Sequence, residues 1–197
     1  MNLPTKITVI RVFLIPIMLL FAMPAPAFLD SWGGIWADAG KWINQWGLYA
    51  AAAVFVAAAL TDLLDGYLAR RMKVVTDMGI FLDPIADKLL VASALIALNT
   101  RQLADGWMVV IIIAREFIVS GLRLVAAGKG MVVTADKIGK LKTLTQMIAI
   151  VALFIGNFPL SLLTDFDFGY CLLWLATLLT IYSGFNYLRI NRQVLKS

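Results

Sequence analysis

Six long apolar stretches constrain what this chain can fold into more than any other feature of the sequence. Of its 197 residues, 61% are hydrophobic, against roughly 45–50% in soluble domains. About 20 apolar residues span a bilayer as an α-helix, and continuous apolar runs do not fit barrel strands. The sequence therefore predicts an all-α integral membrane protein, one domain (1–197) formed by a bundle of six transmembrane helices. The stretches cover approximately residues 7–27, 46–69, 84–100, 106–127, 138–157 and 168–189.

Charged residues are distributed unevenly between the connections. The first, third and fifth connections contain only Lys41 and Arg101 as basic residues, although they hold five aspartates. Many of the 17 basic residues flank the opposite helix ends. Because Lys and Arg accumulate on the cytoplasmic side of membrane proteins, we expect both termini in the cytoplasm.

The first apolar stretch has a second interpretation. Lys6 and Arg11, followed by an apolar run and Ala25-Pro26-Ala27, would also suit a cleaved signal peptide. A retained first helix is the simpler interpretation, and we expect it.

Composition excludes several classes of function. The chain has no histidine and one cysteine, Cys171, so disulfide frameworks, zinc sites and histidine catalysis are excluded. The net charge of +5 belongs to basic residues that flank apolar helices. Anionic lipid and phosphate are therefore better partners than nucleic acid.

Four aspartates lie at helical spacings around the second connection. Asp62 and Asp65 are three residues apart near the end of one apolar stretch, and Asp83 and Asp87 are four apart at the start of the next. Each pair shares one helix face. Across a short cytoplasmic connection, the two pairs can converge.

Four carboxylates at a membrane edge need a counter-charge. Each costs about 2.5–3.5 kcal/mol at membrane depth, and such residues mark functional sites. Carboxylate oxygens suit Mg²⁺ or Mn²⁺, and two such ions can stabilise in-line displacement at phosphorus. We therefore expect a two-metal phosphoryl-transfer site.

Residues beside these aspartates fit a bound nucleotide. Gly66 and Ala69 would allow close approach to the helix, and Arg70 offers a planar cation to a diphosphate. Some of the polar residues also have structural interpretations: Asp83 before Pro84 suits a helix N-cap. Asp77 would be a loop residue, and Lys88 would extend to the interface or neutralise the site.

These residues together match a known signature. The pattern D-x2-D-G-x2-A-R-x8-G-x3-D-x3-D of the CDP-alcohol phosphatidyltransferase family is matched by Asp62, Asp65, Gly66, Ala69, Arg70, Gly79, Asp83 and Asp87. The resemblance implies that the first three aspartates bind two metal ions with the diphosphate of a CDP-linked donor. It implies that Asp87 contacts metal and deprotonates the acceptor hydroxyl. It also implies a homodimer in the bacterial cytoplasmic membrane, with the active site facing the cytoplasm.

A second group of cations lies in the second half of the chain. Arg115 sits near mid-membrane beside Glu116, and Arg123 follows eight residues later, near the same helix face; Lys140 and Lys142 begin the next apolar stretch. A buried arginine must face a polar interior, and together these residues suggest a second anion site for a phosphorylated acceptor. The alternatives are a structural Arg–Glu pair and positive-inside anchoring.

Three segments resemble one branch of the family. A-R-E-F, I-G-K-L-K-T and the opening N-L-P-T-K-I-T-V-I-R are similar to the branch whose acceptor is sn-glycerol 3-phosphate. This implies transfer of the phosphatidyl group from CDP-diacylglycerol, giving phosphatidylglycerol phosphate and CMP. Asn2, Thr5 and Arg11 would then lie near substrate, although Thr5 also suits a helix cap and Arg11 an interfacial anchor.

Other functions remain open from the residues alone. A sister enzyme would use inositol phosphate, serine or another alcohol. A cation transporter could use the same aspartates, although transporter sites lie near the midplane between repeated halves. A purely structural membrane protein gives no reason for four costly carboxylates.

Overall fold

The structure is a computed structural model that describes all residues except 1–2, 73–76, 130–136, 164–165 and 192–197. Side chains of residues 3–7, 30, 62–72, 77–83, 137–138 and 161 are also outside the description. Within the described part, every regular element is helical. The elements are α1 (Leu3–Ala22), α2 (Phe28–Trp32), α3 (Gly34–Met72), α4 (Asp77–Thr100), α5 (Gly106–Gly128), α6 (Lys137–Phe154), the short 3₁₀ helix η1 (Leu160–Leu162) and α7 (Phe168–Ile190).

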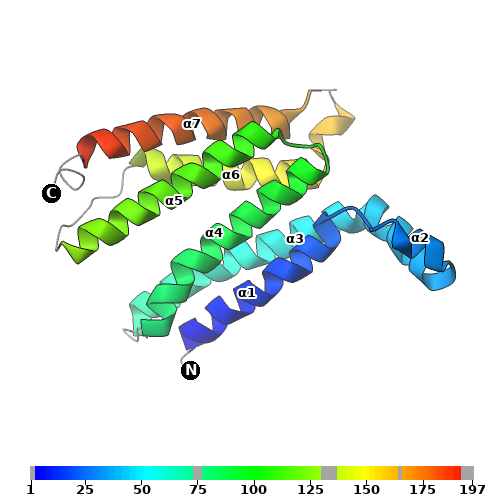
Figure 1. Cartoon of the computed structure of the whole chain (residues 1–197), viewed down its shortest axis with the longest axis horizontal. Helices are drawn as coiled ribbons and strands as arrows, with labels where there is room; N and C mark the ends of the chain where they lie inside the picture. Colours follow the sequence, from blue (N-terminus) through cyan, green and yellow to red (C-terminus); the bar gives the residue numbers. More distant parts are fainter. Residues whose placement is uncertain (1–2, 73–76, 130–136, 164–165, 192–197) are drawn as a thin grey trace. The chain divides into compact units, whose positions relative to one another are not determined.

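The chain divides into two compact units. Unit 1 comprises Met1–Leu103 with Phe154–Gly156, and unit 2 comprises Ala104–Leu153 with Asn157–Ser197. Unit 1 therefore carries α1 to α4, and unit 2 carries α5, nearly all of α6, and α7 (Figure 1).

Helix α1 is the centre of unit 1, because it packs against both α3 and α4. Its buried residues Ile15, Met18 and Ala22 recur at helical spacing. At the crossing with α3, a Cβ on Gly47 would collide with the carbonyl oxygen of Phe21. Small residues at such crossings let helix backbones approach closely, as is common between membrane helices. The first apolar stretch is thus packed into the unit as a helix.

Arg101 joins three segments at one end of unit 1. Its guanidinium donates hydrogen bonds to the carbonyl oxygens of Ala22 (3.0 Å), Met23 (3.0 Å) and Ile43 (3.3 Å). The last carbonyls of a helix have no partner within the helix, and Arg101 supplies one at the end of α1. Burial lowers the pKa of this guanidinium, which nevertheless stays charged at physiological pH.

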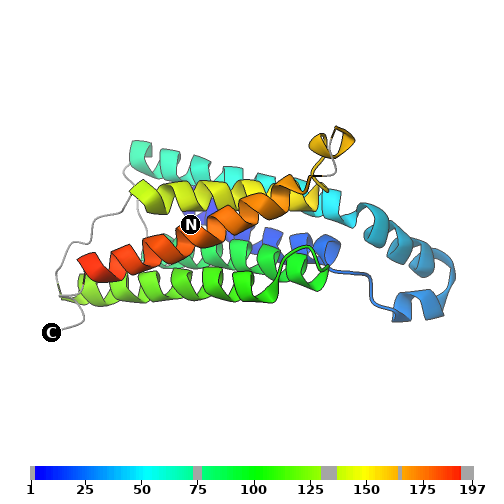
Figure 2. The same cartoon turned by 90° about the horizontal axis from the view of Figure 1, so that it is seen from above.

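In unit 2, α5 runs alongside α7 (Figures 1 and 2). Val119 and Leu122 of α5 form a buried cluster with Tyr187 of α7. The start of α7 is fixed by Asp167, whose carboxylate accepts hydrogen bonds from the Tyr170 amide (2.9 Å) and the Asn157 side chain (2.8 Å). Asp167 is therefore the N-cap of α7, and its carboxylate supplies an acceptor to a backbone N–H of the first turn that has none within the helix.

Most of the expected helix bounds are close to those observed, and two are wrong. The expected start of the second helix at residue 46 is wrong, because α3 begins at Gly34. The expected start of the third helix at Pro84 is also wrong: α4 begins at Asp77, so Asp77 is not a loop residue and Asp83 is not an N-cap. Pro84 fits inside the helix because its φ is helical, although a proline has no N–H to donate to the carbonyl four residues earlier.

Two helical stretches in the described part are long and apolar enough to cross a membrane, Gly34–Thr61 and Phe168–Ile190. Thr8–Ala22 is a shorter apolar helix. The chain is therefore a helical protein with two candidate membrane-spanning helices among its described residues. The full set of six spans and the cytoplasmic termini stay predictions.

Candidate active site

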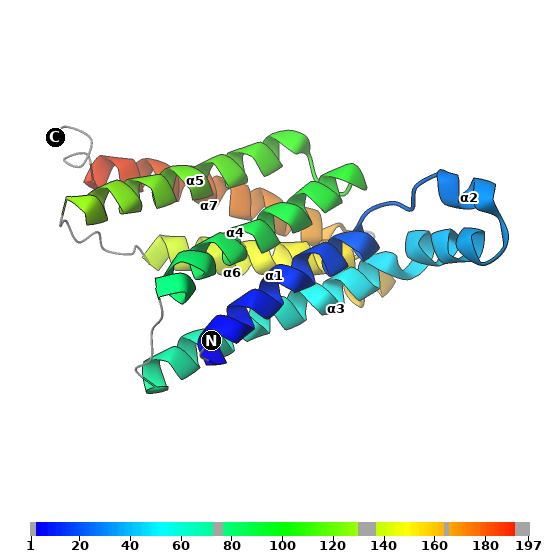
Figure 3. The same ribbon diagram turned by 60° about the horizontal axis from the view of Figure 1, so that its bottom comes forward.

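The four signature aspartates all lie in unit 1. Asp62 and Asp65 are in the last part of α3, while Asp83 and Asp87 are in the first part of α4. The end of α3 and the start of α4 lie at the same end of unit 1 as the start of α1 (Figures 1 and 3). The backbone thus brings the two pairs to one end of the unit.

Of the signature residues, the structure describes only the side chain of Asp87, which is half-buried. The side chains of the other seven, Asp62, Asp65, Gly66, Ala69, Arg70, Gly79 and Asp83, lie outside the described residues. Among the side chains that are described, no group of three acidic, cysteine or histidine residues could hold a metal. Convergence of the four carboxylates therefore stays a prediction.

Next to Asp87, Lys88 folds back onto its own helix. Its ammonium donates a hydrogen bond to the carbonyl oxygen of Pro84 (3.0 Å). This contact keeps the ammonium against the first turns of α4. Both interpretations of Lys88, extension to the interface and neutralisation of the site, stay predictions.

Helix α1 contributes a buried cation near its middle. Arg11 is completely buried, and Thr8 is 2% exposed. Complete burial makes the interfacial-anchor interpretation of Arg11 wrong, because an anchoring head group must reach the surface. Thr5 lies inside α1, which begins at Leu3, so the helix-cap interpretation is also wrong. Asn2 lies outside the described residues.

Unit 2 contains a compact charged cluster formed by Arg115, Glu116 and Lys142. Arg115 Nη1 donates to Glu116 Oε1 (3.2 Å), and the Lys142 ammonium pairs with the same oxygen. The side chain of Lys142 is 1% exposed and that of Arg115 is 14% exposed. The expected Arg–Glu pair exists, but two cations share its one carboxylate. The cluster is therefore a net positive centre inside the unit.

Gly184 makes room for Arg115, and Gly139 lies beside its guanidinium. A Cβ on Gly184 of α7 would lie 3.1 Å from Arg115 Cγ, and one on Gly139 of α6 would lie 3.7 Å from Nη2. Beside Gly184, Ser183 accepts a hydrogen bond from Arg115 Nη2 (3.1 Å). The guanidinium thus lies between Gly139 of α6 and α7, and its hydrogen bond to Ser183 joins it to α7.

The cluster also holds polar atoms that no described residue satisfies. Arg115 Nε is buried without a hydrogen-bond acceptor, and Gln146 Oε1 is buried without a donor. Gln146 lies one turn after Lys142 on α6, hence on the same helix face. Buried polar groups are nearly always hydrogen-bonded. Arg115 Nε is thus an open donor in the cluster, and Gln146 Oε1 is an open acceptor one turn along α6 from Lys142.

The other two predicted acceptor residues are placed differently. Lys140 is exposed, and residues two apart on a helix point to nearly opposite sides, so the structure does not bring it together with Lys142. Arg123 Nε donates to the Tyr187 hydroxyl (3.3 Å), and its guanidinium carbon is 5.7 Å from the centroid of that ring. Arg123 therefore lies along α7, one turn beyond the contact of Arg115 with Ser183.

Sequence reasoning missed the neutral members of this site. Ser183, Gly184 and Gln146 have no charge to attract attention in an apolar sequence. Spacing offered one signal, because Gln146 follows Lys142 at i+4. The contacts of Ser183 and Gly184 with Arg115 depend on how α5 and α7 pack, which the sequence does not state.

These observations define a class of protein: a helical membrane protein with an acidic signature in one unit and a buried cationic cluster in the other. A family model described as CDP-alcohol phosphatidyltransferase matches residues 1–182. The chain belongs to the CDP-alcohol phosphatidyltransferase family.

Alignments with similar proteins cover nearly the whole chain. The CDP-diacylglycerol–glycerol-3-phosphate 3-phosphatidyltransferase of Bacillus subtilis is 46% identical over 196 residues, covering 100% of this chain and 98% of that protein. A protein of the same name from Pseudomonas fluorescens is 40% identical, covering 96% of this chain and 89% of its own length. The one from Rickettsia felis is 35% identical, covering 95% and 94%.

Proposed function

We propose that this protein transfers the phosphatidyl group of CDP-diacylglycerol to sn-glycerol 3-phosphate, giving phosphatidylglycerol phosphate and CMP. Family membership and the names of its full-length relatives support the reaction. One structural observation carries the choice of acceptor. This is the buried cluster of Arg115 and Lys142 on a single carboxylate, with the Nε of Arg115 still open.

The signature aspartates are the proposed metal site. Asp62, Asp65, Asp83 and Asp87 would hold two Mg²⁺ or Mn²⁺ ions, and carboxylate oxygens are the ligands these cations prefer. The half-burial of Asp87 fits a carboxylate that borders a site and remains open to substrate. Bound there, the ions supply positive charge to the diphosphate of the donor. Gly66, Ala69 and Gly79 would leave room for the nucleotide, and Arg70 would offer a further cation to the diphosphate.

In the proposed reaction, the 1-hydroxyl oxygen of the acceptor attacks the β-phosphorus of CDP-diacylglycerol. A new oxygen–phosphorus bond forms, and the bond from that phosphorus to the bridging oxygen breaks. CMP leaves with the electron pair of that bond. The carboxylate of Asp87 accepts the hydroxyl proton, which requires hydrogen-bond reach between the two groups.

The cluster in unit 2 would bind the phosphate of the acceptor. Arg115 and Lys142 offer charge-assisted hydrogen bonds, which are roughly twice as strong as neutral ones. Gln146 Oε1 is a suitable acceptor for a glycerol hydroxyl. Ser183 and Glu116 keep the cations in place when no phosphate is bound. Glycerol 3-phosphate carries both complementary groups, whereas serine and inositol lack the phosphate.

The membrane arrangement follows from charge and family. We infer six spans, both termini in the cytoplasm, and an active site that faces the cytoplasm in a bacterial cytoplasmic membrane. A homodimer is the assembly that the family resemblance favours. The apolar helices would let the acyl chains of both lipids remain in the bilayer during the reaction.

The experiment is CMP release by purified protein in detergent with CDP-diacylglycerol and Mg²⁺. Glycerol 3-phosphate, inositol phosphate, inositol and serine are compared, with Asp87→Asn as the control. We expect turnover with glycerol 3-phosphate alone, abolished by the substitution. Turnover with another acceptor would overturn the acceptor assignment, and no turnover from folded protein with any acceptor would overturn the reaction.

A further inference from the structure

Helix α2 and the first turns of α3 form a hairpin, residues 28–46, at one end of unit 1. The two helices are joined by Gly33 and Gly34, whose φ values of 68° and 54° are in the left-handed region that glycine tolerates. The hairpin projects beyond α1 and α4, and the first turns of α3 turn away from the axis of the rest of that helix (Figures 1 and 3). We call it the aromatic hairpin.

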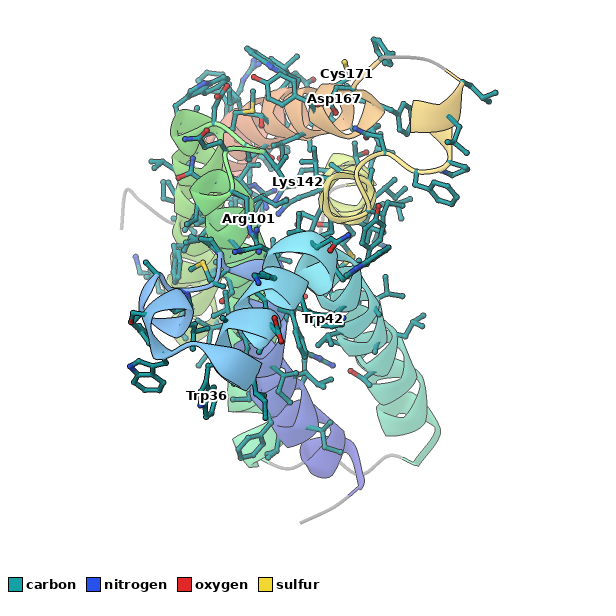
Figure 4. The ribbon with its side chains drawn as sticks, turned by 90° about the vertical axis from the view of Figure 1, so that its right-hand side faces the viewer. Trp36, Trp42, Arg101, Lys142, Asp167 and Cys171 are labelled. Carbon is teal, nitrogen blue, oxygen red and sulfur yellow. The ribbon has the colours of Figure 1, made fainter. Side chains whose placement is uncertain are left out.

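The aromatic hairpin exposes large apolar side chains. Ile35 is 85% exposed, Trp32 is 64% exposed and Trp36 is 56% exposed. Trp36 points outward from the hairpin (Figure 4). The aromatic rings contact each other in sequence, with centroids 5.2 Å apart for Phe28 and Trp32 and 5.9 Å apart for Trp32 and Trp36. Contiguous exposed apolar surface of this kind marks an interaction site.

A single stripe links this surface to the membrane-spanning part of α3. Exposed residues recur at spacings of four and three, so they share one helix face. Polar residues occupy the neighbouring face, where Asp38 and Lys41 form an exposed ion pair (3.6 Å). The hairpin is therefore amphipathic, and its apolar face continues the apolar face of the span. The members of the stripe are Ile35, Ala39, Trp42, Trp46 and Tyr49.

The length of α3 shows where the hairpin must lie. Its apolar part, Gly34–Thr61, has 28 residues, or about 42 Å of helix, which exceeds the roughly 30 Å hydrocarbon core. Asp62 and Asp65 follow at one end, so the excess lies at the other end. The charges of Asp38 and Lys41 make the hydrocarbon core an unfavourable location for the hairpin. The exposed apolar side chains of Ile35 and the tryptophans make bulk water an unfavourable one. The remaining environment is the lipid–water interface, where Trp and Tyr accumulate.

We propose that the aromatic hairpin is an interfacial anchor that lies in the lipid headgroup region of the leaflet opposite the signature aspartates. Its occupant is the bilayer surface, which covers the apolar stripe while Asp38 and Lys41 face water. The anchor fixes the depth of α3, and with it the depth of the aspartates at the other end. It does not depend on which alcohol accepts the phosphatidyl group.

The test is depth measurement by spin labelling in a phospholipid bilayer of phosphatidylglycerol and phosphatidylethanolamine. In a Cys171→Ser background of the full chain, a label is attached at Ile35→Cys or, as the matched control on the polar face six residues away, at Lys41→Cys. Collision with oxygen, which concentrates in lipid, is compared with collision with a water-soluble nickel chelate. We expect the label at position 35 to favour oxygen and the label at position 41 to favour nickel.

Two outcomes would overturn the anchor. Equal nickel access at both positions would show a hairpin in water. A label at position 35 that neither reagent reaches, with spin–spin broadening that disappears on dilution with unlabelled protein, would show that a second copy covers the stripe. A label at Val56→Cys, an exposed position further inside the span, reports that the protein is inserted and must favour oxygen.

Discussion

At the scale of single residues, Glu116 decides whether Arg115 and Lys142 can be buried close together. Lys142 is 1% exposed, and removing the partner of a buried charge costs about 3–5 kcal/mol. In the complex with the acceptor, a phosphate dianion would take the place of the Glu116 carboxylate as the partner of these cations. Glu116 therefore acts as the counter-charge of the unliganded cluster.

We predict that Glu116→Gln lowers the thermal stability of the protein, and that inorganic phosphate restores part of it. A ligand that binds only the folded state stabilises it by RT ln(1 + L/Kd), where L is its free concentration. The measurement is thermal unfolding in detergent with and without phosphate. Asp38→Asn is the control, because Asp38 is exposed and such pairs contribute about 0–1 kcal/mol. An identical phosphate response in both variants would contradict the role of Glu116.

Gly184 matters for the position of Arg115. A methyl group there would lie 3.1 Å from Arg115 Cγ, so the guanidinium must move by a few tenths of an ångström. We predict that Gly184→Ala lowers kcat/KM for glycerol 3-phosphate by roughly 10-fold, since small misplacements are costly in catalysis. Thermal stability should not fall, because Ala is the better helix residue.

Gly121→Ala is the matched control, since open space surrounds that position on α5. Steady-state kinetics with varied acceptor distinguish the two variants. Equal activity of both variants would show that Arg115 does not need its observed position.

At the scale of helices, sequence patterns predicted most of the helices. They did not predict the hydrogen bonds from polar side chains that join these helices. The expected 106–127 and 168–189 match α5 and α7 closely, because uninterrupted apolar runs mark membrane helices. The start of α3 was missed because its first turns are amphipathic instead of uniformly apolar. In the sequence, Arg101 stands out only because it is one of two basic residues in the first, third and fifth connections. Its three carbonyl partners come from two other segments, and no local pattern records them.

We predict that Arg101→Gln destabilises unit 1 without changing the KM for either substrate. The substitution removes charge-assisted hydrogen bonds to Ala22, Met23 and Ile43. Bonds to charged groups contribute about 1.5–3 kcal/mol, so thermal unfolding should shift down by several degrees. Lys41→Gln, which removes an exposed cation, should leave the transition in place. A changed KM with unchanged stability would contradict a purely structural role for Arg101.

At the scale of the whole molecule, the chemistry is divided between the two units. Asp62, Asp65, Asp83 and Asp87 belong to unit 1, while Arg115 and Lys142 belong to unit 2. The sequence predicted both groups because charged residues are rare in apolar helices. It could not separate Lys142 from Lys140, because the side of α6 that is covered depends on packing.

The central claim is that the cluster of unit 2 binds the phosphate of the acceptor. Its most direct test is a cycle that removes the two partners separately: Lys142→Met in the protein, and glycerol in place of glycerol 3-phosphate as acceptor. Interacting partners give non-additive effects in such a cycle. CMP release is measured for wild type, Lys142→Met and Lys140→Met, which makes the same change at an exposed position.

We predict that Lys142→Met lowers kcat/KM for glycerol 3-phosphate by about 10- to 100-fold, the equivalent of one charge-assisted contact. It should leave the slow reaction with glycerol nearly unchanged, and Lys140→Met should resemble wild type with both acceptors. Equal losses with glycerol and glycerol 3-phosphate would contradict the account, because Lys142 would then support the fold or the donor and not the phosphate of the acceptor.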